Sequence, residues 1–142
     1  MLKFIQKKLK EEKGLTLIEL LAVIVILAII AAIAIPAIGN IIQNSREDAL
    51  VADAQNALAA ANLYFTDQGS ANGTNVTVET LVTEGFLDDP GSLNRTGTSV
   101  TKANGGNTLS GSATRDGVTA TFTNATNAGL SANPRTGVAF TR

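Results

Sequence analysis

The hydrophobic and polar positions of this chain change their pattern along its length, and the first clear pattern is an apolar run. Every residue from Leu20 to Ile35 is apolar, and the only charge between Leu15 and Gly39 is Glu19. As a helix rising about 1.5 Å per residue, this stretch spans roughly 37 Å, enough to cross a hydrocarbon core of about 30 Å. In lipid a helix satisfies all backbone hydrogen bonds, so β-branched residues do not prevent it. The run predicts a transmembrane helix over residues 15–39.

After Gly39 the apolar positions fall on one side of a predicted helix. They recur about every three or four residues, the period of an amphipathic helix. The apolar stripe consists of Ile38, Ile42, Leu50, Ala54, Ala57, Leu58, Ala61 and Phe65. The helix is therefore predicted to continue through residues 40–68, and Gly69 with Ser70 and Asn72-Gly73 is predicted to end it.

Pro36 lies inside this predicted helix, and Gly39 follows it closely. Proline removes one backbone hydrogen bond and clashes with the preceding turn, so a kink is expected at Pro36 and Gly39. Two interpretations remain open: a tolerated membrane proline, or a weak segment that stretches or melts when the helix packs against others.

Residues 69–142 are rich in Thr, Asn, Gly and Ser and contain short alternating runs separated by turn residues. The runs are Thr98–Thr101, Thr108–Ser110, Val118–Thr123 and Val138–Phe140. Such runs predict a meander of antiparallel strands. In the clearest run the apolar face holds only Val118, Ala120 and Phe122, too little for a sheet to be stable alone.

The natural partner of this sheet is the apolar stripe of residues 40–68. We therefore predict an α+β fold, in which a long N-terminal helix packs its C-terminal half against a small antiparallel β-sheet. Leu58 from the stripe and Phe122 from the sheet should both be buried in the shared core.

A short segment between the long helix and the main strands is also interpretable. Glu79 to Leu87 predicts a helical turn ended by Gly85, and the residues from Asp88 to Gly91 predict a tight turn. Asp88 and Asp89 with Asn94 are a candidate calcium site. The turn interpretation is favoured, because the oxygen ligands lack a regular spacing.

Composition excludes several chemistries. The chain has no cysteine and no histidine, which removes disulfides, thiolate metal sites, cysteine nucleophiles and the usual general base. No nucleophile elbow, phosphate-binding loop or metal-ligand spacing is visible. We predict that the protein is not an enzyme and needs no cofactor.

Charge is distributed unevenly, although the net charge is only −1. Five lysines and two glutamates give residues 1–14 a side-chain charge of +3, which leaves −4 for the remainder. A basic leader beside an apolar run holds the N-terminus in the cytoplasm and places the C-terminus outside. This topology signal is favoured over a nucleic-acid site for the lysines, so no specific nucleic-acid partner is predicted.

The junction of leader and apolar run carries a family resemblance. It reads Lys13-Gly14-Leu15-Thr16-Leu17-Ile18-Glu19-Leu20-Leu21, followed by the run that Pro36 interrupts. This constellation resembles the class III signal of type IV pilins and pseudopilins. The resemblance implies that prepilin peptidase removes residues 1–14 by cutting after Gly14, that Leu15 is N-methylated, and that Glu19 is the fifth mature residue. The family usually has Phe at the first mature position, so Leu15 is a departure.

The resemblance also implies a domain organisation. Residues 1–14 would be the leader, 15–39 the transmembrane and assembly helix, 40–68 the amphipathic second half of the helix, and 69–142 an extracellular β-rich head. The subunit would be a major pilin. It would be a single-pass membrane protein before assembly and then part of an extracellular pilus. Its partners would be further copies in a helical fibre, prepilin peptidase, the pilus assembly platform and motor, and membrane lipid.

Glu19 is assigned to assembly. A carboxylate inside an apolar bundle is costly unless a cation meets it, and no Lys or Arg occurs between Leu15 and Gln43. The best candidate for this cation is the α-amine of a neighbouring mature subunit.

Two alternatives remain open. One is a pseudopilin of a type II secretion or competence DNA-uptake system. The other is an ordinary membrane-anchored or secreted binding protein, for which Ala32-Ile33-Ala34 resembles a signal-peptidase site.

Overall fold

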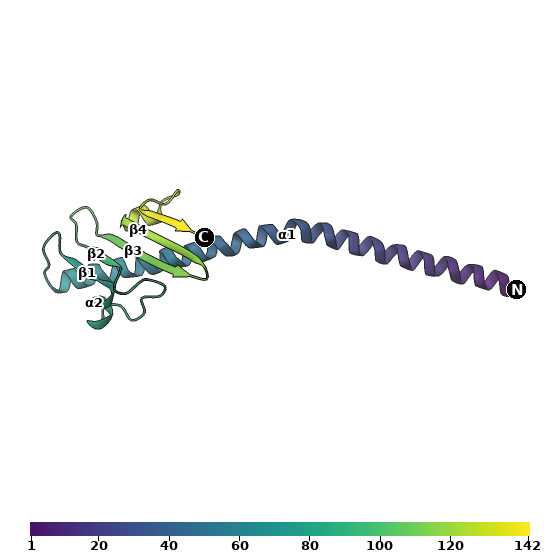
Figure 1. The fold of residues 1–142 in the computed structure, drawn as a ribbon, viewed down its shortest axis with the longest axis horizontal. Helices are drawn as coiled ribbons and strands as arrows, with labels where there is room; N and C mark the ends of the chain where they lie inside the picture. The colour runs from purple at the N-terminus through teal and green to yellow at the C-terminus, as the bar shows by residue number, and fades with distance from the viewer. The chain divides into compact units, whose positions relative to one another are not determined.

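The computed structural model describes the backbone of residues 1–142 and the side chains of residues 1–8 and 14–142. The chain forms two compact units, Met1–Ile42 and Gln43–Arg142. Helix α1 (Leu2–Asp67) begins in the first unit and ends in the second (Figure 1). In the second unit its last turns pack against a five-stranded antiparallel sheet. The predicted α+β fold class is confirmed.

Helix α1 is longer at its N-terminus than the apolar pattern requires. It begins at Leu2 rather than at Leu15, since residues 2–14 contain no proline and only one glycine, Gly14. At its other end Gly69 adopts φ +58°, and the Ser70 amide donates to the Phe65 carbonyl at 3.1 Å. A left-handed glycine followed by such a bond is a common helix C-cap. The helix therefore ends where Gly69 predicts.

The sheet follows the order of the chain, so its strands form a meander, β1-β2-β3-β4-β5. The strands are β1 (Asn75–Thr77), β2 (Ser99–Thr101), β3 (Thr108–Arg115), β4 (Val118–Ala125) and β5 (Val138–Thr141). Helix α2 (Val78–Thr83) connects β1 to β2, and helix α3 (Asn127–Ser131) connects β4 to β5. The meander of four predicted strands is confirmed, and β1 is an additional strand that the alternation did not indicate.

The β3–β4 hairpin shows how local sequence sets the register. Asp116 and Gly117 both have positive φ, 48° and 83°, as the two-residue turn of a tight hairpin requires. The turn places Arg115 opposite Val118 and Ala113 opposite Ala120. This register directs Val118, Ala120 and Phe122 to the buried face, as predicted.

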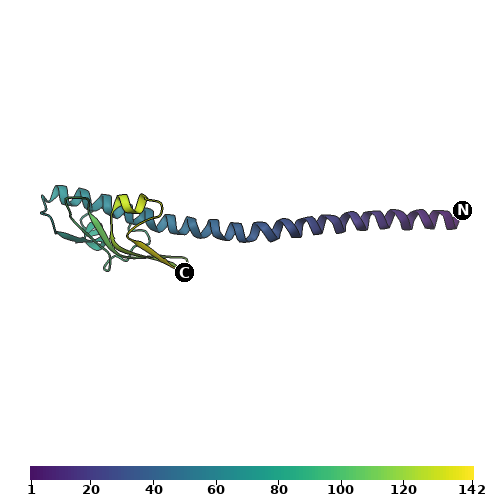
Figure 2. The same ribbon diagram turned by 90° about the horizontal axis from the view of Figure 1, so that it is seen from above.

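The core of the second unit joins the helical stripe to this sheet face. Leu58 is 5% exposed and Phe122 is 2% exposed, so both predicted core residues are buried. The other stripe residues from Leu50 onward are buried as well. Figure 2 shows the sheet along one side of the final turns of α1. The stripe is rich in alanine, whose small side chain allows the helix and the sheet to approach closely.

The predicted stripe was too long at its start. Ile38 and Ile42 are 53% and 47% exposed, because they belong to the first unit and not to the core of the second. The sheet-facing stripe begins at Leu50, and the two isoleucines extend the exposed apolar surface of residues 15–42.

Truncation of the core should destabilise the second unit strongly. We expect Leu58→Ala and Phe122→Ala each to lower the free energy of unfolding by about 2–5 kcal/mol, because each leaves a cavity between helix and sheet. Urea denaturation of a soluble chain that starts at Gln43 measures this change. Leu63→Ala is the matched control, since Leu63 lies on the same helix but is 62% exposed. Equal midpoints for Leu58→Ala and Leu63→Ala would contradict the assigned core.

Candidate processing and assembly site

The predicted processing junction lies within a continuous stretch of helix. Gly14, Leu15 and Glu19 all belong to α1, and all three are exposed. A Cβ atom built at Gly14 meets no other atom within 4 Å, and this residue does not have a positive φ. Neither packing nor backbone conformation within the described chain therefore requires glycine at this position. A requirement for glycine would have to come from a molecule that approaches the backbone here.

Leu15 and Glu19 lie four residues apart on the helix, so they share a face. Their Cα atoms are separated by about 6 Å along the helix axis. The carboxylate of Glu19 is exposed, and no basic side chain of the described residues forms an ion pair with it. This face therefore presents a carboxylate close to the position at which a new N-terminus would form.

The described residues of the first unit expose all of their large apolar side chains. In the described part of Leu15–Ile42 every residue is exposed except Ala34, which is partly buried. One helix of the described chain, placed within Gly14–Asp67, is long and apolar enough to cross a membrane, and an 18-residue stretch of it has a mean hydropathy of 3.2. An apolar surface of this extent is unstable in water and has to be covered by lipid or by other protein.

Pro36 and Gly39 both lie within α1, which continues through them. Proline has no N–H to donate to the Ala32 carbonyl, so this turn lacks one helical hydrogen bond. A Cβ at Gly39 meets nothing within 4 Å, so packing within the chain does not require a glycine there. The kink assigned to these two residues stays a prediction.

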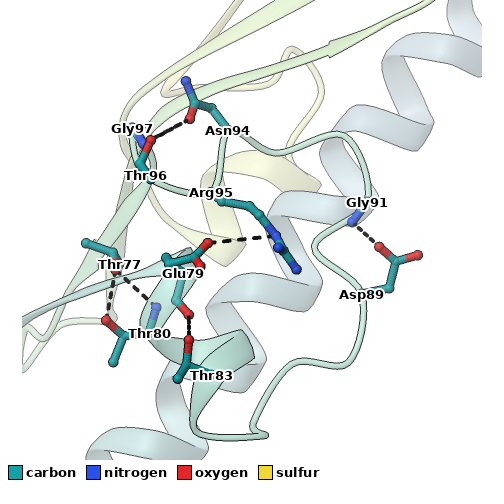
Figure 3. A network of polar contacts seen from close by, with 10 residues as sticks. All are labelled: Thr77, Glu79, Thr80, Thr83, Asp89, Gly91, Asn94, Arg95, Thr96 and Gly97. Carbon is teal, nitrogen blue, oxygen red and sulfur yellow. Dashed lines mark hydrogen bonds and ion pairs between the residues drawn. The ribbon is translucent and has the colours of Figure 1, made fainter.

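The candidate calcium residues serve local turns. Asp89 accepts a hydrogen bond from the Gly91 amide at 2.8 Å, and Asn94 accepts one from the Gly97 amide at 3.0 Å. Figure 3 shows these two side chains in different turns, with the ion pair of Arg95 and Glu79 between them. Among the described residues no group of three acidic side chains could hold a metal ion. The turn interpretation accounts for Asp89 and Asn94.

Asp53 has a structural role that the sequence did not reveal. Its carboxylate accepts from the Ser92 amide at 2.8 Å and lies 3.9 Å from the Arg115 guanidinium. A Cβ built at Gly91 would lie 2.4 Å from this carboxylate, which explains the glycine. The sequence gives no sign of this role, because the partners of Asp53 are distant along the chain.

The basic side chains of the second unit are all engaged within the chain. Each arginine forms an ion pair, and the pairs are Arg46–Asp116, Arg95–Glu79, Arg115–Asp53, Arg135–Asp48 and Arg142–Glu47. The sixth basic residue, Lys102, donates to the Ser70 carbonyl at 2.6 Å. Exposed pairs contribute little stability individually, but they place a carboxylate beside each guanidinium. The described part of this unit thus offers no unpaired arginine patch to a phosphate backbone.

A family model for the prokaryotic N-terminal methylation motif matches residues 9–35. The chain carries this motif. It is the hallmark of the class III signal peptides of type IV pilins and pseudopilins, so the predicted resemblance is confirmed. The matched range includes Gly14, Leu15 and Glu19 and ends just before Pro36. No curated protein and no solved structure shows significant similarity to the chain.

The motif bears on several general properties of the chain. It points to a structural protein rather than an enzyme, and it implies processing by prepilin peptidase and assembly into a polymer. The motif and the apolar helix together fit membrane anchoring before assembly.

Proposed function

We propose that this pilin-like chain is a structural subunit, and specifically a major pilin, of a type IV pilus. The observation that carries the proposal is the position of the methylation motif. Residues 9–35 lie on helix α1, whose large apolar side chains from Leu15 to Ile42 are exposed, while the second unit has a separate and complete core. The apolar helix is therefore not needed to fold the head, which leaves it free to serve anchoring and polymerisation.

The same apolar surface suits both stages. Before assembly it lies in lipid, and in the fibre it lies against identical helices. Moving an apolar helix from lipid to a protein bundle changes its hydrophobic free energy little, so packing and charge pairing decide whether subunits associate. Assembly can then proceed directly from the membrane without exposing the helix to water.

Glu19 and the new N-terminus supply the charge pairing in this proposal. Cleavage after Gly14 would create an α-amine at Leu15, one helical turn from the Glu19 carboxylate of the same subunit. In a dry bundle both charges need partners, and a neighbouring subunit shifted along the axis can provide them reciprocally. N-methylation of Leu15 would leave the amine basic. Because an α-amine is present at Leu15, beside the apolar helix, only after cleavage, processing would switch on assembly.

Pro36 and Gly39 mark the place where the helix would adapt to its neighbours. The missing hydrogen bond at Pro36 and the low helix propensity of Gly39 make this the weakest part of the apolar segment. A kink or local unwinding there would let the anchoring half of the helix adjust to a crowded bundle while the head stays folded.

The proposed organisation follows the four parts of the chain. Residues 1–14 are the leader, 15–39 the anchor and assembly helix, 40–68 the amphipathic second half of the helix, and 69–142 the extracellular β-rich head. The proposed partners are prepilin peptidase, membrane lipid before assembly, the assembly platform and motor, and other copies of the chain. The final location would be a pilus on the cell surface.

A pseudopilin of a secretion or DNA-uptake system would use the same motif. The engaged arginines of the second unit favour a fibre subunit over a head that itself binds DNA. Fibre length separates the remaining two functions, since a pilin forms long surface fibres that shearing releases.

N-terminal sequencing of the chain from sheared surface fibres tests the proposal. We expect a methylated Leu15 at the N-terminus. An N-terminus at Ile35 would indicate a secreted protein, and one at Met1 an uncleaved membrane anchor. Either of these two results would overturn the proposed pilin function.

A further inference from the structure

Two Asn-Gly dipeptides of the second unit each occupy the centre of a four-residue turn. Asn72-Gly73 forms the centre of a turn in which the Thr74 amide donates to the Ala71 carbonyl at 3.2 Å. Asn104-Gly105 forms the centre of a turn in which the Gly106 amide donates to the Ala103 carbonyl, also at 3.2 Å. Both asparagines are exposed. The two turns can therefore be compared within one chain, although Gly73 has φ +85° and Gly105 does not have a positive φ.

The two asparagines also line the same groove. Its volume is about 620 Å³, and α1, the two turns and the start of α3 border it. Lys102 is its only charged lining residue. No carboxylate of the described residues lines the groove, so a new negative charge there would offset the positive charge of Lys102.

The turns also differ in the hydrogen bonding of the glycine amide that follows the asparagine. The Gly73 amide donates to the Lys102 carbonyl at 2.9 Å, and the Lys102 amide donates back to the Thr74 carbonyl at 2.8 Å. These two bonds extend the β1–β2 ladder, in which Asn75 lies opposite Thr101. The Gly105 amide makes no hydrogen bond within the described chain. Gly73 is thus held by the sheet, whereas Gly105 is not.

This difference matters because an asparagine side chain can react with the amide nitrogen of the next residue. The reaction needs that nitrogen to leave its hydrogen bonds and approach the side-chain carbonyl carbon. A glycine favours it, since no Cβ obstructs the approach. The sheet obstructs the reaction at Asn72 and leaves it open at Asn104.

We propose that Asn104 is a site of spontaneous deamidation and that Asn72, in the turn before β1, is protected. The Gly105 nitrogen bonds to Cγ of Asn104, and the bond from Cγ to the side-chain nitrogen breaks. The proton of the Gly105 amide leaves with that nitrogen as ammonia. Solvent water then opens the resulting succinimide at either carbonyl, giving aspartate or isoaspartate at position 104. The overall change consumes one water and releases one ammonia, with no oxidation or reduction.

The product places a carboxylate in the groove beside Lys102 and makes the second unit one charge more negative. When the ring opens to isoaspartate, the backbone of the β2–β3 connection also gains one atom. An exposed subunit would therefore change its groove with age, without any enzyme.

The test is a time course on the purified full-length chain in detergent micelles at mildly alkaline pH. Peptide mass mapping follows the conversion of amide to acid at each asparagine, and isoelectric focusing follows the acidic shift of the whole chain. We expect conversion at Asn104 to be about fivefold faster than at Asn72, the factor that corresponds to one backbone hydrogen bond of average strength. Equal rates, or a faster reaction at Asn72, would overturn the proposal.

Two variants supply the controls. Gly105→Ala should slow conversion at Asn104 several-fold and leave Asn72 unchanged. It should not disturb the fold, because its Cβ meets no atom within 4 Å and Gly105 does not have a positive φ. Asn104→Gln should remove most of the acidic shift, since the longer side chain forms the corresponding ring poorly. Unchanged conversion in Gly105→Ala, or an undiminished shift in Asn104→Gln, would contradict the assigned site.

Discussion

Replacing Glu19 with alanine is expected to abolish fibre formation while membrane insertion and cleavage continue. Insertion depends on the basic leader and the apolar run, and cleavage depends on the junction at Gly14, so both should be unaffected. Assembly should fail because the α-amine of a neighbouring subunit would be left buried without its counter-ion. Breaking a buried pair in this way costs roughly 3–5 kcal/mol. The loss would recur at every subunit contact along the fibre.

The measurement compares sheared fibre with membrane-held subunit in cells that make Glu19→Ala. We expect mature-sized subunit in the membrane and little or none in the sheared fraction. Glu19→Gln is the matched control, since it keeps the size and polarity of the side chain and removes only its charge. Normal fibre yield from Glu19→Ala would mean that Glu19 lies at the lipid interface, paired with lipid or with its own α-amine.

Replacing Gly14 with valine is expected to leave a full-length precursor in the membrane. Gly14 is exposed, and the chain itself has space for a side chain there, so the substitution should not disturb the helix, in which valine has a slightly higher propensity than glycine. A protease that grips the backbone at this junction should be blocked by the new side chain. The expected result is complete loss of the mature form and, with it, of fibres.

Gel mobility and N-terminal sequencing of the membrane fraction measure this effect. Gly39→Val is a useful control, because a Cβ at Gly39 also meets nothing within 4 Å and the residue lies far from the junction. Mature-sized protein from Gly14→Val would remove the cleavage assignment, whereas precursor accumulation in both variants would indicate a general defect of the helix.

The features predictable from the sequence are those that local patterns encode. The long helix follows from an apolar run and a one-sided stripe, and β4 follows from the alternation of Val118–Thr123. Residues 111–115 of β3 lie beyond the predicted run Thr108–Ser110. Strand β1 and helix α3 have three and five residues, too few for a period to be recognised. Their formation depends on pairing with β2 and on burial of Leu130, which only the folded chain supplies.

The candidate site also has features that the sequence predicts and features that it does not. The processing junction is contiguous, so its motif can be read directly from residues 13–21. The roles of Asp53 and of the ion pairs could not be read, because each joins positions that are distant in sequence. The proposed partner of Glu19 lies in another molecule, so neither the sequence nor the fold of one chain contains it.

The meander order of the sheet bears on how quickly the second unit would fold if it is exported as proposed. Consecutive strands are also adjacent in space, so each pairing closes only a short or moderate loop and loses little chain entropy. Topologies dominated by such local contacts fold fast. We expect the sheet to form strand by strand as the chain emerges from the membrane, with docking of the helical stripe as the one long-range event. A head of this topology would spend little time with open strand edges, the state in which a crowded cell surface favours aggregation.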